Sequence, residues 1–80
     1  MNTEQLLKEL DEIFQKVLKK DAIKLNLDST ANDVDGWTSL TNMLLIKAIE
    51  DKYGIHFGFR EIIKLRNVGD LCDAIMKKTA

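Results

Sequence analysis

Apolar residues of this chain recur every three and four positions, and this spacing restricts the fold more than any other feature. Near the N-terminus the positions that follow it are Leu6, Leu7, Leu10, Ile13, Phe14, Val17 and Leu18. Charged residues separate them, so such a helix has one apolar face. The chain also has no proline among its 80 residues. We therefore expect an all-α protein, a small four-helix bundle with three long helices and one short helix, in which residues 1–80 form one domain.

Residues that cap helices indicate where the helices begin and end. The expected helices span residues 3–19, with Asn2 or Thr3 as N-cap, residues 39–53, a short stretch within residues 58–65, and residues from 68 onward. Thr38 precedes the second helix and Gly54 follows it, as N-cap and C-cap residues do. Asn67 and Asp70 form a variant capping box at the start of the last helix.

A long loop, residues 20–38, is expected between the first and second helices, because turn-forming residues replace the helical spacing there. Ile23, Leu25 and Leu27 are expected to anchor it in the core, and Trp37 to pack where it meets the second helix, with a partner for its indole N–H. This length exceeds that of an ordinary connection between helices, which indicates a function or a crossover between distant helix ends.

Few residues fit a catalytic or metal site. The loop acids resemble the middle of a calcium loop, but Ala31 and Asn42 occupy the EF-hand positions that require carboxylates, so no metal site is expected. Cys72 lies on the apolar face of the last helix and is expected to be buried. His56 is expected at the surface without a catalytic partner. The sequence therefore shows neither a catalytic triad nor a Cys/His cluster with zinc spacing.

The charges are nearly balanced, with 12 lysine and arginine residues against 13 aspartate and glutamate residues. This balance and the lack of a one-sided basic helix argue against nucleic-acid binding, and no apolar run is long enough for membrane insertion. The single cysteine gives no sign of an oxidising compartment, so a cytoplasmic location is expected. The chain is also expected to be a monomer. Five acids and one base lie within residues 28–51, which favours partners that present lysine or arginine.

Ser39 is the most informative single residue, because it begins an apolar helix. Free backbone N–H groups and the helix dipole favour an attached phosphate at such a position. Serine at a helix start is more often only a cap, but here Thr38 can cap the helix and leave the Ser39 hydroxyl free. A phosphodiester on Ser39 and a purely structural cap are the two interpretations.

The second helix has two apolar faces, which is more than a small core can bury. One consists of Leu45, Ile46, Ile49 and Tyr53, and the other is a stripe of Leu40, Leu44 and Ala48. The stripe beside Ser39 is expected to be exposed as a partner surface. The alternative is that the long loop covers it.

The stretch that starts at Ser39-Leu40 and ends in acids, Tyr53 and Gly54 resembles the second helix of the acyl carrier proteins, as does the later run Val68-Gly69-Asp70-Leu71. The resemblance covers nearly the whole chain. It implies that Ser39 carries 4′-phosphopantetheine, whose thiol holds an acyl group as a thioester. The aspartate that precedes the serine in the family is Thr38 here.

This resemblance implies a non-catalytic carrier with a phosphopantetheinyl transferase and acyl-loading and acyl-using enzymes as partners. The residues expected to dock these partners are Thr38, Leu40, Met43, Leu44 and Lys47. The family usually has more acids where Leu44 and Lys47 stand. A tryptophan before the run Thr38-Ser39-Leu40 also resembles the sequences of stand-alone carriers outside fatty-acid synthesis. Both features favour a specialised biosynthetic pathway. The alternatives are an aminoacyl or peptidyl carrier and an unmodified interaction module with the same fold.

Overall fold

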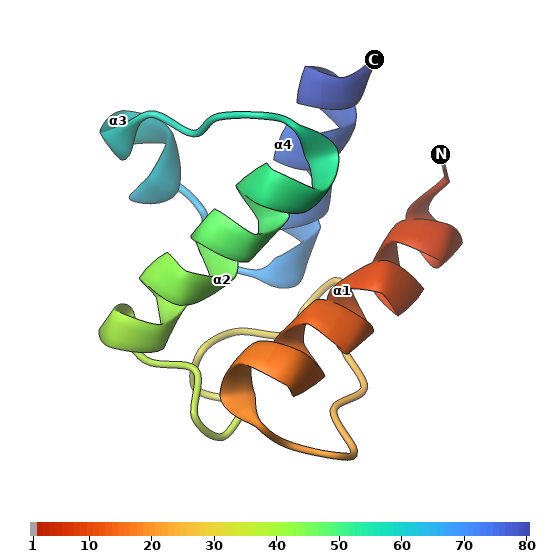
Figure 1. Ribbon diagram of the computed structural model, residues 1–80, viewed down its shortest axis with the longest axis vertical. Coiled ribbons are helices and arrows are strands. Elements are labelled where there is room, and N and C mark those ends of the chain that lie inside the picture. The colour runs from red at the N-terminus through yellow and green to blue at the C-terminus, as the bar shows by residue number, and fades with distance from the viewer. Residues whose placement is uncertain (1) are drawn as a thin grey trace.

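The computed structural model describes residues 2–80 and contains four helices and no strand within that range. The helices are α1 (Thr3–Leu18), α2 (Ser39–Tyr53), α3 (Phe59–Ile62) and α4 (Val68–Thr79). In Figure 1, α1 descends from the N-terminus, α2 and α4 ascend, and the short α3 lies to the upper left. The long loop between α1 and α2 passes beneath them. The expectation of a four-helix all-α bundle is confirmed.

The core lies between α1, α2 and α4. Its buried hydrophobic residues are Leu6, Leu10 and Phe14 of α1, Leu45, Ile46 and Ile49 of α2, Val68, Leu71, Cys72 and Ile75 of α4, and Leu25 and Phe57 of the connections. On each long helix these residues recur every three or four positions, which is why one face of each helix meets the others. No residue of α3 itself is buried.

The helix ends follow the predicted caps closely. Asn2 caps α1 by accepting a hydrogen bond from the Gln5 N–H, and Gly54 ends α2 in the left-handed conformation, with φ 64°. The first helix ends at Leu18 instead of residue 19, because Lys19 turns into the left-handed conformation, with φ 57°. The Lys19 N–H still donates to the Gln15 carbonyl, so the turn closes the helix.

The start of α4 differs from the predicted capping box. Asn67 Oδ1 accepts the Asp70 N–H at 2.8 Å, as expected. The Asp70 carboxylate, however, accepts a hydrogen bond from the Arg66 N–H at 3.1 Å and not from that of Asn67. The second hydrogen bond of the capping box therefore comes from the residue before the N-cap and not from the N-cap itself.

The loop is held by backbone contacts with α1 and α4. Leu25 is buried, and its N–H donates to the Asp11 carboxylate at 2.7 Å. Leu27 is 43% exposed, so the expectation that its side chain anchors the loop is wrong. Its carbonyl accepts the Gly69 N–H at 2.8 Å instead, while the Ser29 carbonyl accepts the Val68 N–H at 2.9 Å.

Within residues 2–80, no helix is long and apolar enough to cross a membrane.

Candidate functional site

The N-terminus of α2 is capped by Thr38 and not by Ser39. Thr38 Oγ1 accepts the Thr41 N–H at 3.2 Å, and Thr41 Oγ1 accepts the Thr38 N–H at 2.7 Å. This reciprocal pair is a capping box built from two threonines. Ser39 is the first helical residue, and it is exposed. Its hydroxyl forms no hydrogen bond with any residue of the described chain, so it is free to react.

Two side chains that the sequence analysis did not single out as site residues fix the chain before Ser39. Thr41 Oγ1 donates to the Gly36 carbonyl at 2.6 Å, and Asn42 Oδ1 accepts the Trp37 indole N–H at 2.9 Å. The Trp37 ring meets Phe14 of α1 edge to face, with centroids 4.9 Å apart. The threonine spacing at positions 38 and 41 was a readable signal for the capping box between them, but not for the contact of Thr41 with Gly36. The Trp37 contacts confirm the expected anchor and its indole partner.

The electrostatics at Ser39 favour a bound anion. The first turn of α2 contains no acidic residue. Thr38 serves the N–H groups of Thr41 and Asn42, whereas those of Ser39 and Leu40 have no partner in residues 2–80. Free N–H groups and the positive end of the helix dipole stabilise a phosphate. An exposed hydroxyl beside them therefore fits a phosphodiester.

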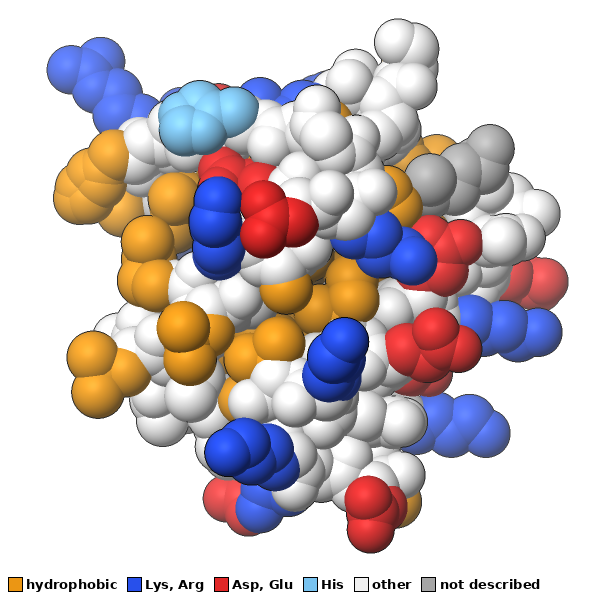
Figure 2. Space-filling model, in the orientation of Figure 1, with side chains coloured by type: hydrophobic (Ala, Val, Ile, Leu, Met, Phe, Trp, Pro, Cys, Tyr) orange, Lys and Arg blue, Asp and Glu red, His pale blue; other side chains and the backbone are white. Residues whose placement is uncertain are grey.

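The residues expected to dock partners lie together on the exposed side of α2. Leu40, Met43 and Leu44 are 82%, 53% and 59% exposed, so the loop does not cover them. Ala48, the last residue of the expected stripe, is only partly exposed and lines a groove with residues of α1, so the exposed stripe is shorter than expected. Thr38 is also exposed, and Lys47 pairs with Asp51 across one helical turn at 3.2 Å. Figure 2 shows hydrophobic side chains collecting on the left edge of the molecule, over this part of α2.

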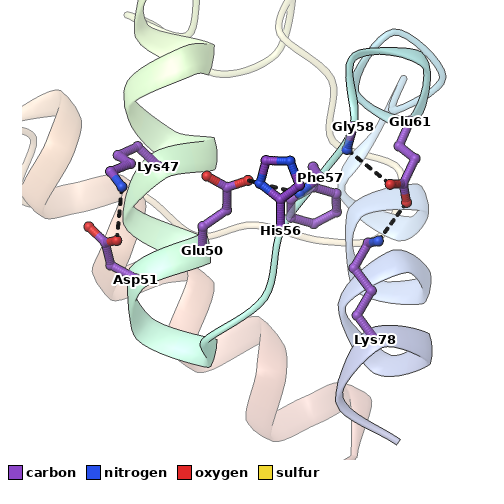
Figure 3. A network of polar contacts seen from close by, with 8 residues as sticks. All are labelled: Lys47, Glu50, Asp51, His56, Phe57, Gly58, Glu61 and Lys78. Carbon is purple, nitrogen blue, oxygen red and sulfur yellow. Dashed lines mark hydrogen bonds and ion pairs between the residues drawn. The ribbon is translucent and has the colours of Figure 1, made fainter.

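The other candidate side chains have structural surroundings. Cys72 is buried, and burial with a smaller effect of Asp73 raises the pKa of its thiol to about 11. His56 lies at the surface as expected, but its Nδ1 is 3.3 Å from a Glu50 carboxylate oxygen, a neighbour that the sequence analysis missed. That Glu50 oxygen also accepts the Phe57 N–H, so it organises the turn after α2 (Figure 3).

The loop acids are also engaged locally. Asp35 pairs with Lys20 at 2.9 Å, and this hydrogen bond and charge lower the pKa of the Asp35 carboxyl. Asp33 accepts hydrogen bonds from the N–H and hydroxyl of Thr30. In residues 2–80, no group of three or more potential ligands gathers as a metal site would require.

A hydrogen bond links α1 to the far end of α2. The Tyr53 hydroxyl donates to the Glu9 carboxylate at 2.6 Å. This bond lowers the pKa of Glu9, with a smaller contribution from Gln5. Burial and the same bond raise the pKa of Tyr53.

Comparisons with known proteins agree on one family. Residues 8–75 match the protein family described as the phosphopantetheine attachment site. The chain is 31% identical over 67 residues to an acyl carrier protein homolog of Ureaplasma parvum serovar 3, covering 81% of this chain and 87% of that protein. Its fold matches a solution structure of holo acyl carrier protein from Geobacter metallireducens with a TM-score of 0.84 and 46% identity, covering 90% of this chain and 83% of that one.

Proposed function

Because this chain belongs to the phosphopantetheine-binding acyl carrier protein family, whose prosthetic group is 4′-phosphopantetheine, we propose that it carries that group on Ser39 and presents acyl cargo to partner enzymes. The observation that supports this site most directly is the exposed Ser39 hydroxyl at the N-terminus of α2. Thr38 performs the capping that serine usually performs there. We propose that residues 1–80 act as one carrier domain.

Ser39 would be modified by transfer from coenzyme A. Its Oγ forms a bond to the phosphorus that bears the pantetheine, and the bond from that phosphorus to the leaving 3′,5′-adenosine bisphosphate breaks. The hydroxyl proton passes to a base of the transferase. The free N–H groups of Ser39 and Leu40 at the N-terminus of α2 would favour the negative charge of a phosphodiester on Ser39.

The role of the chain in this proposal is to position the cargo and not to react with it. When bound, the prosthetic group supplies a terminal thiol that holds the acyl group as a thioester. The capping box and the Trp37 contacts keep the attachment point in one orientation. Thr38, Leu40, Met43, Leu44 and Lys47 would contact the enzymes that load and use the cargo.

We propose a specialised biosynthetic pathway for this carrier. Leu44 and Lys47 occupy positions where the resemblance leads one to expect acids, and Leu44 is exposed, so partners would meet a more apolar α2. Aminoacyl cargo is the alternative within the same chemistry. The other alternative is an unmodified interaction module, for which Thr38 in place of the family aspartate is the supporting observation.

The test is the intact mass of the purified chain after incubation with a phosphopantetheinyl transferase and coenzyme A. We expect the mass to rise by one phosphopantetheinyl group, and Ser39→Ala to abolish this gain without changing the helical circular dichroism. Ser29 is the other serine of the chain and is buried, so Ser29→Ala is the matched control and should still be modified. No modification with several transferases would favour the unmodified module. Modification at another residue would overturn the site.

A further inference from the structure

The exposed apolar surface continues from α2 onto α3. Among the residues described, five of the six exposed large hydrophobic side chains belong to these two helices and the residue after α3, namely Leu40, Met43, Leu44, Phe59 and Ile63. Phe59 is 70% exposed and Ile63 64% exposed. Figure 2 shows the hydrophobic side chains running down one edge, from the region of α3 to the start of α2. We call these five residues the α2–α3 apolar surface.

The acids of α2 and α3 are already satisfied by donors within the fold. The contacts are Glu50 with the Phe57 N–H at 2.8 Å and His56 at 3.3 Å, Asp51 with Lys47 at 3.2 Å, and Glu61 with Lys78 at 2.8 Å and the Gly58 N–H at 3.0 Å (Figure 3). No acid lies between Ser39 and Ile49. The α2–α3 apolar surface therefore has little free negative charge of its own.

The unpaired charge beside this surface is positive. Arg60 and Lys64 are exposed, and neither forms an ion pair with residues 2–80. At helical spacing, Arg60 lies next to the face that presents Phe59 and Ile63. Lys64 also borders the groove that the α4 acids Asp70 and Asp73 line, whereas Arg60 does not line that groove.

We propose that the α2–α3 apolar surface binds a partner protein whose apolar groove is rimmed by aspartate and glutamate side chains. The apolar residues supply the buried contact, and Arg60 and Lys64 select an acidic rim because a basic rim would repel them. A partner with basic residues was expected from the five acids within residues 28–51. Those acids lie in the long loop or already bind donors of this chain, so they leave little negative charge at the α2–α3 apolar surface. Two cations are fewer than the about four to eight that recognise an anionic membrane, so a protein is the better fit. That this partner is an enzyme using the cargo rests on the proposed function.

The test uses two synthetic amphipathic helical peptides with the same leucine face, one with glutamates and one with lysines on the other face. Binding to the full chain is followed by nuclear magnetic resonance at physiological salt. The glutamate peptide should bind more tightly and shift the signals of the α2–α3 apolar surface. Phe59→Ser should abolish this binding, and Arg60→Glu with Lys64→Glu should weaken it at least about fivefold, as expected for two exposed ion pairs.

Charge reversal at a distant place is the matched control. Lys8 is exposed on α1 and Lys24 is exposed on the long loop, so Lys8→Glu with Lys24→Glu changes the net charge equally. Affinity for the glutamate peptide should stay near the wild-type value, because charges beyond about 8 Å are screened at this salt.

The inference is overturned if the lysine peptide binds as tightly or more tightly, or if neither peptide binds. It is also overturned if the surface binds only phosphatidylglycerol vesicles or only a second copy of the chain. Peptide binding does not require modification, so Ser39→Ala should bind like the wild type. A chain that is never modified but prefers the glutamate peptide would refute the proposed function alone. A modified chain without that preference would refute this inference alone.

Discussion

Leu44 and its neighbour Leu45 allow a sharp test of which side of α2 is free. Leu44 is 59% exposed, whereas Leu45 is 1% exposed. Substitution by glutamate makes the same chemical change at both positions, once on the surface and once in the core. Leu44→Glu should leave the fold intact, and Leu45→Glu should not.

The magnitudes follow from burial. Full burial of a leucine side chain contributes about 2 kcal/mol, and about two fifths of Leu44 is buried, so Leu44→Glu should lower the free energy of unfolding by about 1 kcal/mol or less. Leucine and glutamate have similar helix propensities, so the backbone adds little. At Leu45 an unpaired carboxylate would enter the core, which costs several kcal/mol. A chain of 80 residues has a total stability of only about 4–12 kcal/mol.

The assay is thermal unfolding followed by circular dichroism. Each kcal/mol shifts the melting temperature of a domain this size by about 4–8 °C, so Leu44→Glu should lower it by less than about 8 °C. Leu45→Glu should lower it by more than about 20 °C or leave the chain unfolded. Leu44→Glu should still weaken peptide binding at the α2–α3 apolar surface. Similar losses of stability at both positions would refute the assignment of Leu44 to a free surface.

Three further predictions concern the attachment site, the core and the contact between α1 and α2. Thr38→Asp should be nearly neutral for stability, because both residues cap helices, but should speed modification of Ser39 by a generic transferase, measured from mass spectra over time; an unchanged rate would contradict this. Cys72 should react slowly with a thiol reagent at pH 8 in the folded chain and rapidly in denaturant, because burial raises its pKa to about 11; equal rates would contradict its burial. Glu9 has a lowered pKa in the folded chain, so its stabilising effect is present above the unfolded pKa near 4.5 and is lost as the pH falls through the lower folded value. Tyr53→Phe removes the main cause, so denaturant unfolding should show a smaller loss of stability below pH 5 than in the wild type; an equal loss would show that the hydrogen bond is not the cause.

The fold could be predicted where the signal is local. Thr38 and Gly54 set the ends of α2 by their own conformational preferences, and the structure places both as expected. Leu27 was misjudged because its hydrophobicity suggested a core anchor, whereas its carbonyl makes the contact. The left-handed Lys19 could not be foreseen, since nothing in a lysine favours that conformation.

The attachment site was also predictable where adjacent residues determine it and unpredictable where tertiary contacts do. The exposed Ser39 and its capping neighbour Thr38 could be read from adjacent residues. The contact of Trp37 with Phe14 joins residues on different elements, so sequence spacing does not reveal it. The identity of Asn42 as the indole partner depended on the same tertiary arrangement.

The backbone contacts between the long loop and α4 make the loop part of the last helix's folding unit. The amide protons of Val68 and Gly69 are held by loop carbonyls, so they exchange with solvent only when the loop lifts away. A Cβ on residue 69 would lie 3.0 Å from the Leu27 carbonyl oxygen, so Gly69→Ala would push the two apart. Hydrogen exchange at these two amides therefore reports loop opening separately from global unfolding. The segment leading to Ser39 thus owes its order partly to the C-terminal helix, and cutting short that helix would loosen a region distant in sequence.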